Sequence, residues 1–242
     1  MEGIFMTSFD AISQYYDDMI NSRKIDDFYI ELVRPYQSND SLCVLDLGCG
    51  TGAFLSKIKA TTKVGVDISY GMISQAKAKV PEGKFYVSSL NDFCFTELTY
   101  DCVVSMYDVI NMLQRFSEWE NLFSHVAKSL KPGGIFAFDI NDVKRQDYLC
   151  EHSPMIKKIK NDYSITEITK IEEEKYKWET LYFRFVKDGL YILERMENIE
   201  YSPLNSDVFQ VLKKFFAKVN CISPSFLDSE SVRNKSFYIC YK

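Results

Sequence analysis

The sequence has few of the residues on which several common kinds of site depend. Only 2 histidines occur among the 242 residues, so a catalytic triad built on histidine is not expected. The 7 cysteines form no CxxC pair and have no nearby histidine at zinc spacing. We therefore expect reduced thiols in the core, and neither a metal site nor a disulfide framework.

Long apolar runs and an excess of positive charge are also missing. No run of about twenty apolar residues occurs, and the acidic start MEGIFMTSFDAISQYYDD does not resemble a secretory signal, so we expect a cytoplasmic protein without membrane contact. The net charge of −5 and the isoelectric point near 5.2 argue against a broad electrostatic grip on nucleic acid. A small-molecule partner is the simpler expectation.

What the sequence does have is a regular alternation of strands and helices through its first 140 residues. Apolar periodicity predicts helices at 9–20, 25–36, 52–60, 70–80 and 117–130. It predicts strands at 42–47, 63–68, 84–87, 100–107 and 135–140, the last after a turn KPGG. This order predicts an α/β fold with a doubly wound, mostly parallel sheet.

After about residue 141 the rhythm changes to long segments of period two. Segments 163–171, 176–186 and 190–201 predict an antiparallel meander, and the last two meet at the hairpin signal KDG. A helix at 207–219 and a strand at 236–242 follow. The short basic run IKKIKN is interpreted as a solvated face.

The domain organisation follows from this change of rhythm. We expect one α/β domain formed by residues 1–144 and 203–242, interrupted by an antiparallel β subdomain at residues 145–202. The inserted sheet is interpreted as a lid over the acceptor or as a dimer contact.

The stretch VLDLGCGTG, residues 44–52, places three glycines where the first strand turns into its helix. Ligands of doubly wound sheets bind at this edge, and Asp67 at the end of the next strand is placed to accept the two hydroxyls of a ribose. The spacing is G-x-G-x-G instead of the dinucleotide G-x-G-x-x-G, and it follows Asp46. An acid there would repel a pyrophosphate and suits a cofactor with a positive amino group.

The motifs VLDLGCGTG, VGVDIS, YDCVVSMYDVIN and LKPGGIFAFDIN, in this order and spacing, resemble the class I S-adenosylmethionine-dependent methyltransferases. The C-terminal part resembles that family's antiparallel last hairpin. The resemblance implies a seven-stranded sheet, S-adenosylmethionine as cofactor with S-adenosylhomocysteine as product, and methyl transfer to an N or O atom of a small molecule. A monomer or homodimer is expected.

The resemblance also implies roles for individual residues. Those expected at the cofactor are Asp46, Gly48, Cys49, Gly50, Gly52, Asp67, Ile68, Ser89, Leu90 and Met106. Candidate catalytic residues are Tyr16, Tyr107 and Asp108. Candidates for the acceptor pocket are Tyr15, Asn111, Asp139 and Asn141.

One position departs from the family pattern. Ser89 stands where the family usually presents an acid to the adenine amino group. The hydroxyl of Ser89 or the backbone of Leu90 is one substitute. The alternative is Asp92 after a loop shift, although Asp92 also suits a cap of the next segment.

Two other functions stay open. An RNA or protein methyltransferase is one, but the chain has SMYD where amine-methylating nucleic-acid enzymes usually carry an Asn/Asp-Pro-Pro-aromatic motif. A non-catalytic S-adenosylmethionine-binding protein is the other, and the departure at Ser89 keeps it open.

Overall fold

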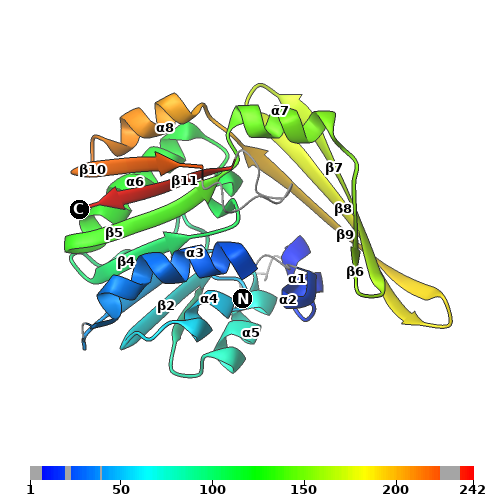
Figure 1. The fold of residues 1–242 in the computed structure, drawn as a ribbon, viewed down its shortest axis with the longest axis horizontal. Coiled ribbons are helices and arrows are strands. Elements are labelled where there is room, and N and C mark those ends of the chain that lie inside the picture. Colours follow the sequence, from blue (N-terminus) through cyan, green and yellow to red (C-terminus); the bar gives the residue numbers. More distant parts are fainter. Residues whose placement is uncertain (1–6, 20–22, 39, 224–234) are drawn as a thin grey trace.

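The computed structural model describes residues 7–19, 23–38, 40–223 and 235–242. These residues form a seven-stranded sheet with the order β10-β11-β5-β4-β1-β2-β3 and a separate four-stranded sheet with the order β6-β7-β8-β9 (Figure 1). The strands of the first sheet are β1 Cys43–Leu47, β2 Thr62–Asp67, β3 Lys84–Val87, β4 Tyr100–Ser105, β5 Leu130–Ile140, β10 Lys218–Ile222 and β11 Ser236–Tyr241.

The pairing within the first sheet is mostly parallel. Strands β3, β2, β1, β4 and β5 pair in parallel, whereas β11 pairs antiparallel with both β5 and β10. The predicted α/β fold, with a doubly wound, mostly parallel seven-stranded sheet and an antiparallel last hairpin, is therefore confirmed.

Helices cover both faces of this sheet, because its apolar strands alternate between two cores. The helical elements are α1 Ser8–Ile12, α2 Tyr16–Met19, α3 Arg23–Val33, η1 Arg34–Ser38, α4 Ala53–Lys57, α5 Tyr70–Lys79, η2 Val109–Met112, α6 Phe116–Ser129, α7 Val143–Glu151 and α8 Asn205–Leu212. In β1, Val44 packs into the core formed with α3, α4 and α5, while Leu45 packs into the core formed with α6 and α8. Period-two alternation sends neighbouring side chains to opposite faces.

The second sheet consists of β6 Met155–Ile159, β7 Asp162–Glu172, β8 Lys175–Lys187 and β9 Leu190–Tyr201, all antiparallel. Asp188 and Gly189 have φ of 51° and 75°, which is the backbone of a tight hairpin turn at the predicted KDG. In Figure 1 this sheet extends to the right of the first sheet, and α1 and α2 lie beside β9. The domain boundaries drawn from the sequence stay a proposal.

Four local predictions are wrong, each because tertiary contacts override a periodic pattern. The predicted helix 9–20 is broken into α1 and α2, and Asp10 of α1 accepts hydrogen bonds from Ser69 Oγ and Gly71 N, both at 2.7 Å. The predicted helix 207–219 ends at Leu212, and its last residues join β10 because they pair with β11.

The other two errors concern the insertion and the turn before β5. The insertion begins with α7, where no helix was predicted. The basic run at 156–161 is largely exposed, as predicted, and its Lys157 and Lys158 belong to β6 and pair with β7. The KPGG segment lies within the span of β5, at a register shift against β4.

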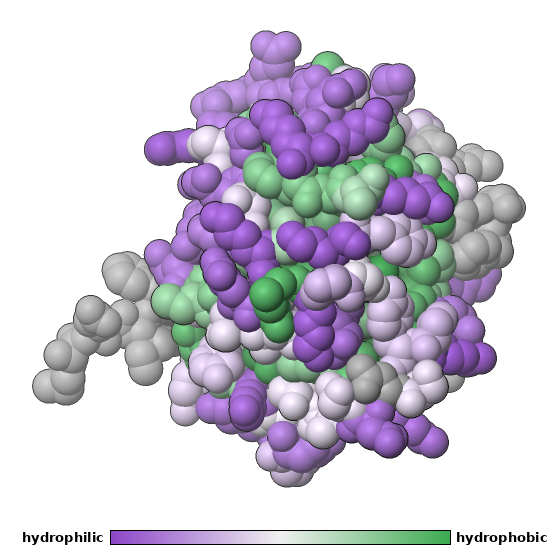
Figure 2. Space-filling view, turned by 90° about the vertical axis from the view of Figure 1, so that its left-hand side faces the viewer, coloured by the Kyte–Doolittle hydropathy of each residue, from purple (hydrophilic) through white to green (hydrophobic). Residues whose placement is uncertain are grey.

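The surface and the thiols complete the description. Figure 2 shows the side at the left of Figure 1, where hydrophilic side chains predominate and hydrophobic ones lie between them. All 7 cysteines are free, as predicted, although Cys94 and Cys221 are exposed instead of lying in the core. Among the described residues, no helix is both long and apolar enough to cross a membrane, and no cluster of three or more metal-ligating side chains occurs.

Candidate active site

The glycine loop between β1 and α4 is fixed against the end of β2. Gly48 and Gly50 have φ of 74° and 50°, a region that side chains with a Cβ resist. The N–H groups of Gly48 and Cys49 donate to the carbonyl of Val66 at 2.8 and 2.9 Å. A Cβ on Gly48 would lie 2.4 Å from a methyl carbon of Val109, so this position needs glycine for both its conformation and its space.

Asp67 joins this loop to the start of α5. One of its carboxyl oxygens accepts from Gly50 N and the other from Ser69 N, both at 2.9 Å. Burial raises the pKa of Asp67, although these two N–H groups act to lower it. Each oxygen keeps lone pairs that are free for a ligand hydroxyl.

Asp46, in the middle of β1, is a buried carboxyl without a partner. It is 0% exposed, and neither oxygen has a hydrogen-bond partner among the described residues. Burial, and secondarily the neighbouring Asp67 and Asp26, raise the pKa of Asp46 well above its usual value. Because buried polar groups are nearly always satisfied, this carboxyl is suited to a cationic or hydrogen-bonding ligand.

The glycine loop opens on a cleft with two lobes, which we call the glycine-loop cleft. The first lobe, about 360 Å³, includes Thr51, Asp26, Lys57 and Lys79 in its wall. The second lobe, about 280 Å³, is lined on one side by Asp67 and Ile68, by the turn after β3 at residues 88–91, and by Met112 to Gln114. Both lobes share five residues: Tyr16, Gly48, Gly50, Tyr107 and Val109.

Tyr107 and Asp108 follow β4 in a strained pair of left-handed conformations, with φ of 61° and 63°. The carboxylate of Asp139, at the end of β5, accepts from Tyr107 N at 3.0 Å and from Asp108 N at 3.2 Å. The Tyr107 hydroxyl donates to Asp26 in the wall of the first lobe. These bonds hold the Tyr107 ring at the junction of the two lobes.

A buried lysine completes this arrangement. Lys235, just before β11, has a side chain only 4% exposed, and its ammonium lies 2.6 Å from Asp139 and also pairs with Asp108. Burial lowers the pKa of this ammonium. The two carboxylates raise it by more than burial lowers it, so the pKa lies above its usual value. Burial raises the pKa of Asp108, and the positive charge of Lys235 offsets part of this increase.

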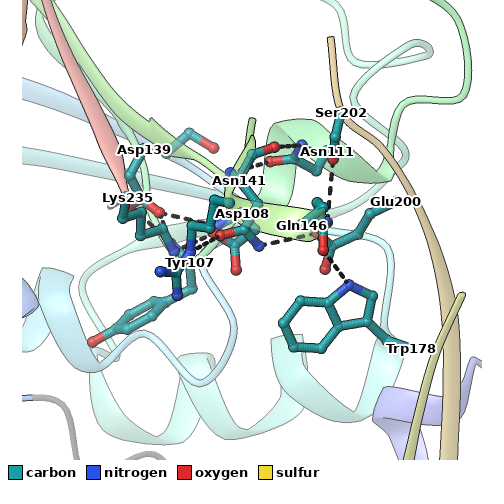
Figure 3. A network of polar contacts seen from close by, with 12 residues as sticks. Tyr107, Asp108, Asn111, Asp139, Asn141, Gln146, Trp178, Glu200, Ser202 and Lys235 are labelled. Atoms are coloured by element: carbon teal, nitrogen blue, oxygen red, sulfur yellow. Dashed lines mark hydrogen bonds and ion pairs between the residues drawn. The ribbon is translucent and has the colours of Figure 1, made fainter. Parts of the chain in front are cut away.

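Figure 3 shows that these residues continue into a larger polar network between the two sheets. Asn111 Nδ2 donates to the carbonyls of Asn141 and Tyr201, both at 2.9 Å, and its Oδ1 accepts from Asn141 N at 3.1 Å. Glu200 of β9 accepts from Asn141 at 3.1 Å and from Gln146 of α7 at 2.6 Å. We call the following set the bridging network: Asp108, Asn111, Asp139, Asn141, Arg145, Gln146, Glu200, Ser202 and Lys235.

Most of the residues predicted at the cofactor line the glycine-loop cleft. They are Gly48, Cys49, Gly50, Asp67, Ile68, Ser89, Leu90 and Met106. Asp46 lies buried beneath it, and Gly52 packs against Ala76 of α5 as the N-cap of α4. Ser89 donates to Asp92 at 2.5 Å, so two of the candidate partners of the adenine amino group contact each other.

The predicted catalytic and acceptor residues separate into two groups. Tyr16 and Tyr107 line both lobes. Asn111, Asp139 and Asn141 are each 0% exposed, belong to the bridging network and line neither lobe. The remaining two, Tyr15 and Asp108, also line neither lobe, and the ring of Tyr15 lies 4.8 Å from the guanidinium of Arg184 on β8.

Sequence reasoning missed several residues at the site. Asp26 and Lys57, which pair at 2.5 Å, come from α3 and α4, and Asp17 of α2 accepts from Thr51 Oγ1 at 2.5 Å. Glu200 lies near the end of β9 and Lys235 just before β11. A charge beside a strand end is common on surfaces, so the sequence carries no specific signal for either residue.

With this geometry established, comparisons with known proteins decide the family. Residues 44–134 match a methyltransferase domain family. This segment belongs to that family. The methyltransferase domain therefore carries the glycine loop, Asp67, the turn after β3 and the Tyr107–Asp108 pair.

Relatives and solved structures extend the likeness beyond this domain. A putative methyltransferase of Geobacillus sp. (strain WCH70) is 26% identical over 151 residues, which cover 59% of this chain and 61% of that protein. An S-adenosylmethionine-dependent methyltransferase from Clostridium acetobutylicum has a TM-score of 0.75 at 20% identity, covering 96% of this chain and 97% of its own.

A third likeness is the S-adenosylmethionine-bound amino pentose methyltransferase CalS10 from Micromonospora echinaspora. Its TM-score is also 0.75, at 13% identity, and the match covers 100% of this chain and 99% of that protein. At such identities these structures show a shared fold that includes the second sheet. The predicted class I methyltransferase fold is confirmed, and residues 44–134 match the methyltransferase domain.

Proposed function

We propose that this chain binds S-adenosylmethionine in the glycine-loop cleft and transfers its methyl group to an N or O atom of a small molecule. The observation that carries this proposal is the combination of Asp67, which keeps free lone pairs in the second lobe, with Asp46, buried and unpartnered beneath the glycines. The domain match and the fold neighbours support the same assignment.

The residues present fit this cofactor at two points. Asp67 is the acceptor for the two ribose hydroxyls. Gly50 N and Ser69 N each donate to a different oxygen of its carboxylate, so each oxygen keeps a lone pair for a hydroxyl. Asp46 is suited to the ammonium of the methionine part, because a cation offsets the cost of burying its carboxylate.

The first lobe suits the zwitterionic end of an amino acid. Its wall contains two ion pairs, Lys57 with Asp26 and Lys79 with Asp17. A wall with charges of both signs matches an ammonium and a carboxylate carried by a single carbon.

When bound, the cofactor supplies a methyl carbon already activated by the sulfonium. The protein therefore has to align the acceptor with the S–CH₃ axis and exclude water. Tyr16 and Tyr107, which line both lobes, form the walls at which this alignment takes place. The position of Tyr107 is fixed by hydrogen bonds to Asp26 and Asp139.

Asp108 is the proposed proton acceptor for an amine or hydroxyl that arrives protonated. Its side chain is 18% exposed, and burial raises the pKa of its carboxyl, which Lys235 opposes. Asp108 and Asp67 both act on the buried hydroxyl of Tyr16, whose pKa is raised first by burial and then by these carboxylates. Asp108 lies next to Tyr107 of the cleft wall, although its own side chain lines neither lobe.

The acceptor enters, in this proposal, beneath the second sheet. Lys160 of the β6–β7 turn pairs with Asp18 of α2 at 2.6 Å, and Arg184 stacks on Tyr15, so the sheet and the N-terminal helices contact each other beside the cleft. The neighbour described as an amino pentose methyltransferase favours an amine-bearing acceptor. The cytoplasmic location and the monomeric or homodimeric state stay predictions.

Two measurements test the proposal. Thermal stabilisation by S-adenosylhomocysteine but not by NAD is expected, since a ligand that binds only the native state raises its melting temperature. Stabilisation by NAD alone would overturn the proposal. Transfer of radiolabelled methyl to a metabolite extract is expected next, and cofactor binding without any labelled acceptor would identify a binding protein instead.

A further inference from the structure

The turn after β3 replaces the acid of the family pattern with a pair of residues. Ser89 lines the second lobe, whereas Asp92 lines a different pocket that does not include Ser89. The Ser89 hydroxyl donates to the Asp92 carboxylate at 2.5 Å, and Asp92 N donates back to Ser89 Oγ at 3.2 Å. The carboxylate thus lies behind the hydroxyl as viewed from the cleft.

Counting lone pairs shows what this pair presents to a ligand. A serine hydroxyl has one hydrogen to donate and two lone pairs to accept with. The hydrogen is directed to Asp92, and one lone pair is taken by Asp92 N–H. One acceptor position remains on Ser89 Oγ, and an ionised partner strengthens such a bond.

We propose that Ser89, held as a hydrogen-bond acceptor by Asp92, reads the exocyclic amino group of the adenine of the cofactor. This inference rests on the proposed function and concerns only the base. The pair presents a hydrogen-bond acceptor to the base, as the missing acid would. Asp92 accepts the hydrogen of the Ser89 hydroxyl and so keeps it from turning toward the base. The cleft therefore selects adenine over hypoxanthine, whose carbonyl at the same position needs a donor.

The position of Ser89 in the fold supports this assignment. Ser88 N donates to the carbonyl of Asp67 at 2.9 Å, so the end of β3 lies directly beside the residue proposed to hold the ribose. Ile68, 55% exposed, and Leu90 line the same lobe and offer apolar surface to the faces of a base. A base attached to a ribose at Asp67 therefore has its edge toward residues 88–91.

Other polar residues of the second lobe are largely committed elsewhere. Gln114 Nε2 donates to the carbonyls of Met112 and Ile199, both at 2.8 Å. Glu118 Oε2 accepts from the backbone N–H groups of Gln114 and Arg115, at 2.8 and 3.2 Å. Asn91 is exposed and lines the same lobe, which makes it a matched control for Ser89.

The test is calorimetric titration of the whole chain with S-adenosylhomocysteine and with S-inosylhomocysteine, its deaminated analogue. The unchanged protein is expected to prefer the adenine form by about tenfold or more, because a mismatched base leaves a polar group unpaired. S89A is expected to reduce this ratio to about threefold or less. N91A is expected to leave the ratio as it is.

Variants at Asp92 separate a relay from a simple serine contact. D92A releases the Ser89 hydroxyl to donate to the carbonyl of the analogue, so the ratio falls because the inosine form binds more tightly. D92N keeps an acceptor oxygen for that hydroxyl, and S89D restores an acceptor directly. Both are expected to keep the preference for adenine.

The outcomes distinguish this inference from the proposed function. If the unchanged protein binds neither compound, the proposed function fails. If it binds S-adenosylhomocysteine but S89A and D92A keep the original ratio, or N91A or E118Q removes it, the role of the pair is overturned. Unchanged circular dichroism and melting temperature of each variant show that the ratios report on the site.

Discussion

The glycine-loop cleft and the bridging network lie at the same edge of the sheet but are built in different ways. The cleft uses backbone shape and single acids placed at strand ends that are close in sequence, such as Asp46 and Asp67. The bridging network uses buried charges from distant parts of the chain, such as Asp108 and Lys235, whose ammonium and carboxylate pair inside the protein. The first arrangement is suited to binding, and the second to holding two sheets in one geometry.

Lys235→Met is expected to have the largest effect and to act on stability. It leaves the carboxylates of Asp108 and Asp139 buried without their cation, which costs about 3–5 kcal/mol of the free energy of unfolding. Urea denaturation measures this loss. The control is Lys160→Met, whose ion pair with Asp18 has side chains 75% and 62% exposed.

The control variant is expected to change the free energy of unfolding by less than about 1 kcal/mol. Equal losses in the two variants would show that the bridging network holds nothing that a surface pair does not. The claim that the bridging network, unlike the cleft, serves to stabilise the fold would then be wrong.

Gly48→Ala is expected to act on binding. The new Cβ collides with Val109 and meets a φ of 74°, so the loop must move, and we expect S-adenosylhomocysteine affinity to fall at least about a hundredfold, or 2.7 kcal/mol. Calorimetry measures this fall.

Gly133→Ala is the matched control for that variant. Its φ is 78°, but nothing lies within 4 Å of the new Cβ. It carries the conformational cost of about 1–2 kcal/mol in stability while leaving affinity unchanged. A similar loss of affinity in both variants would place the cause in backbone strain alone.

Asp46→Asn is expected to trade affinity for stability. Removing a buried, unpartnered carboxylate stabilises the ligand-free protein by about 1 kcal/mol, and it weakens S-adenosylhomocysteine binding about tenfold. Thermal unfolding with and without ligand measures both. A variant that is less stable without ligand would contradict the view that Asp46 awaits a cation.

Glu200→Gln is expected to change the pH dependence of stability. Burial, and secondarily Asp108, raise the pKa of Glu200 to about 8, so the folded protein binds this proton more tightly than the unfolded chain. The contribution is complete below the unfolded pKa and is lost as pH rises through the folded one, with a slope of at most about 1.4 kcal/mol per pH unit.

The glutamine variant should lose this part of the slope between about pH 5 and 8. Glu197→Gln, an exposed position on the same strand β9, is the control and should follow the unchanged protein. Urea midpoints across this range make the measurement. Parallel curves for all three proteins would show that Glu200 does not contribute to the pH dependence of stability.

The sequence predicted the glycine turn and the acid beside it because local patterns encode them. Three glycines between an apolar strand and a helix, and an acid at the end of the following strand, specify this arrangement without knowledge of distant contacts. The same logic found the hairpin at Asp188.

The placement of the acceptor candidates needed the tertiary structure. Asp139 and Asn141 follow a buried strand, as site residues do, and in the folded protein both are fully buried in hydrogen bonds. Neither Lys235 nor Glu200 lies in a motif that indicates burial. The packing of β9 against η2 and of β11 against β5 removes them from water.

The sequence by itself determined the α/β alternation, the bare backbone at residues 48–52 and the acid at 67, because each depends on residues close along the chain. Only the tertiary structure decided that Ser89 and Asp92 pair, that α1 and α2 separate, and that two acids share one buried lysine. Desolvation sets the strength of these charge interactions, and burial is a property of the assembled layers, which no short stretch of sequence contains.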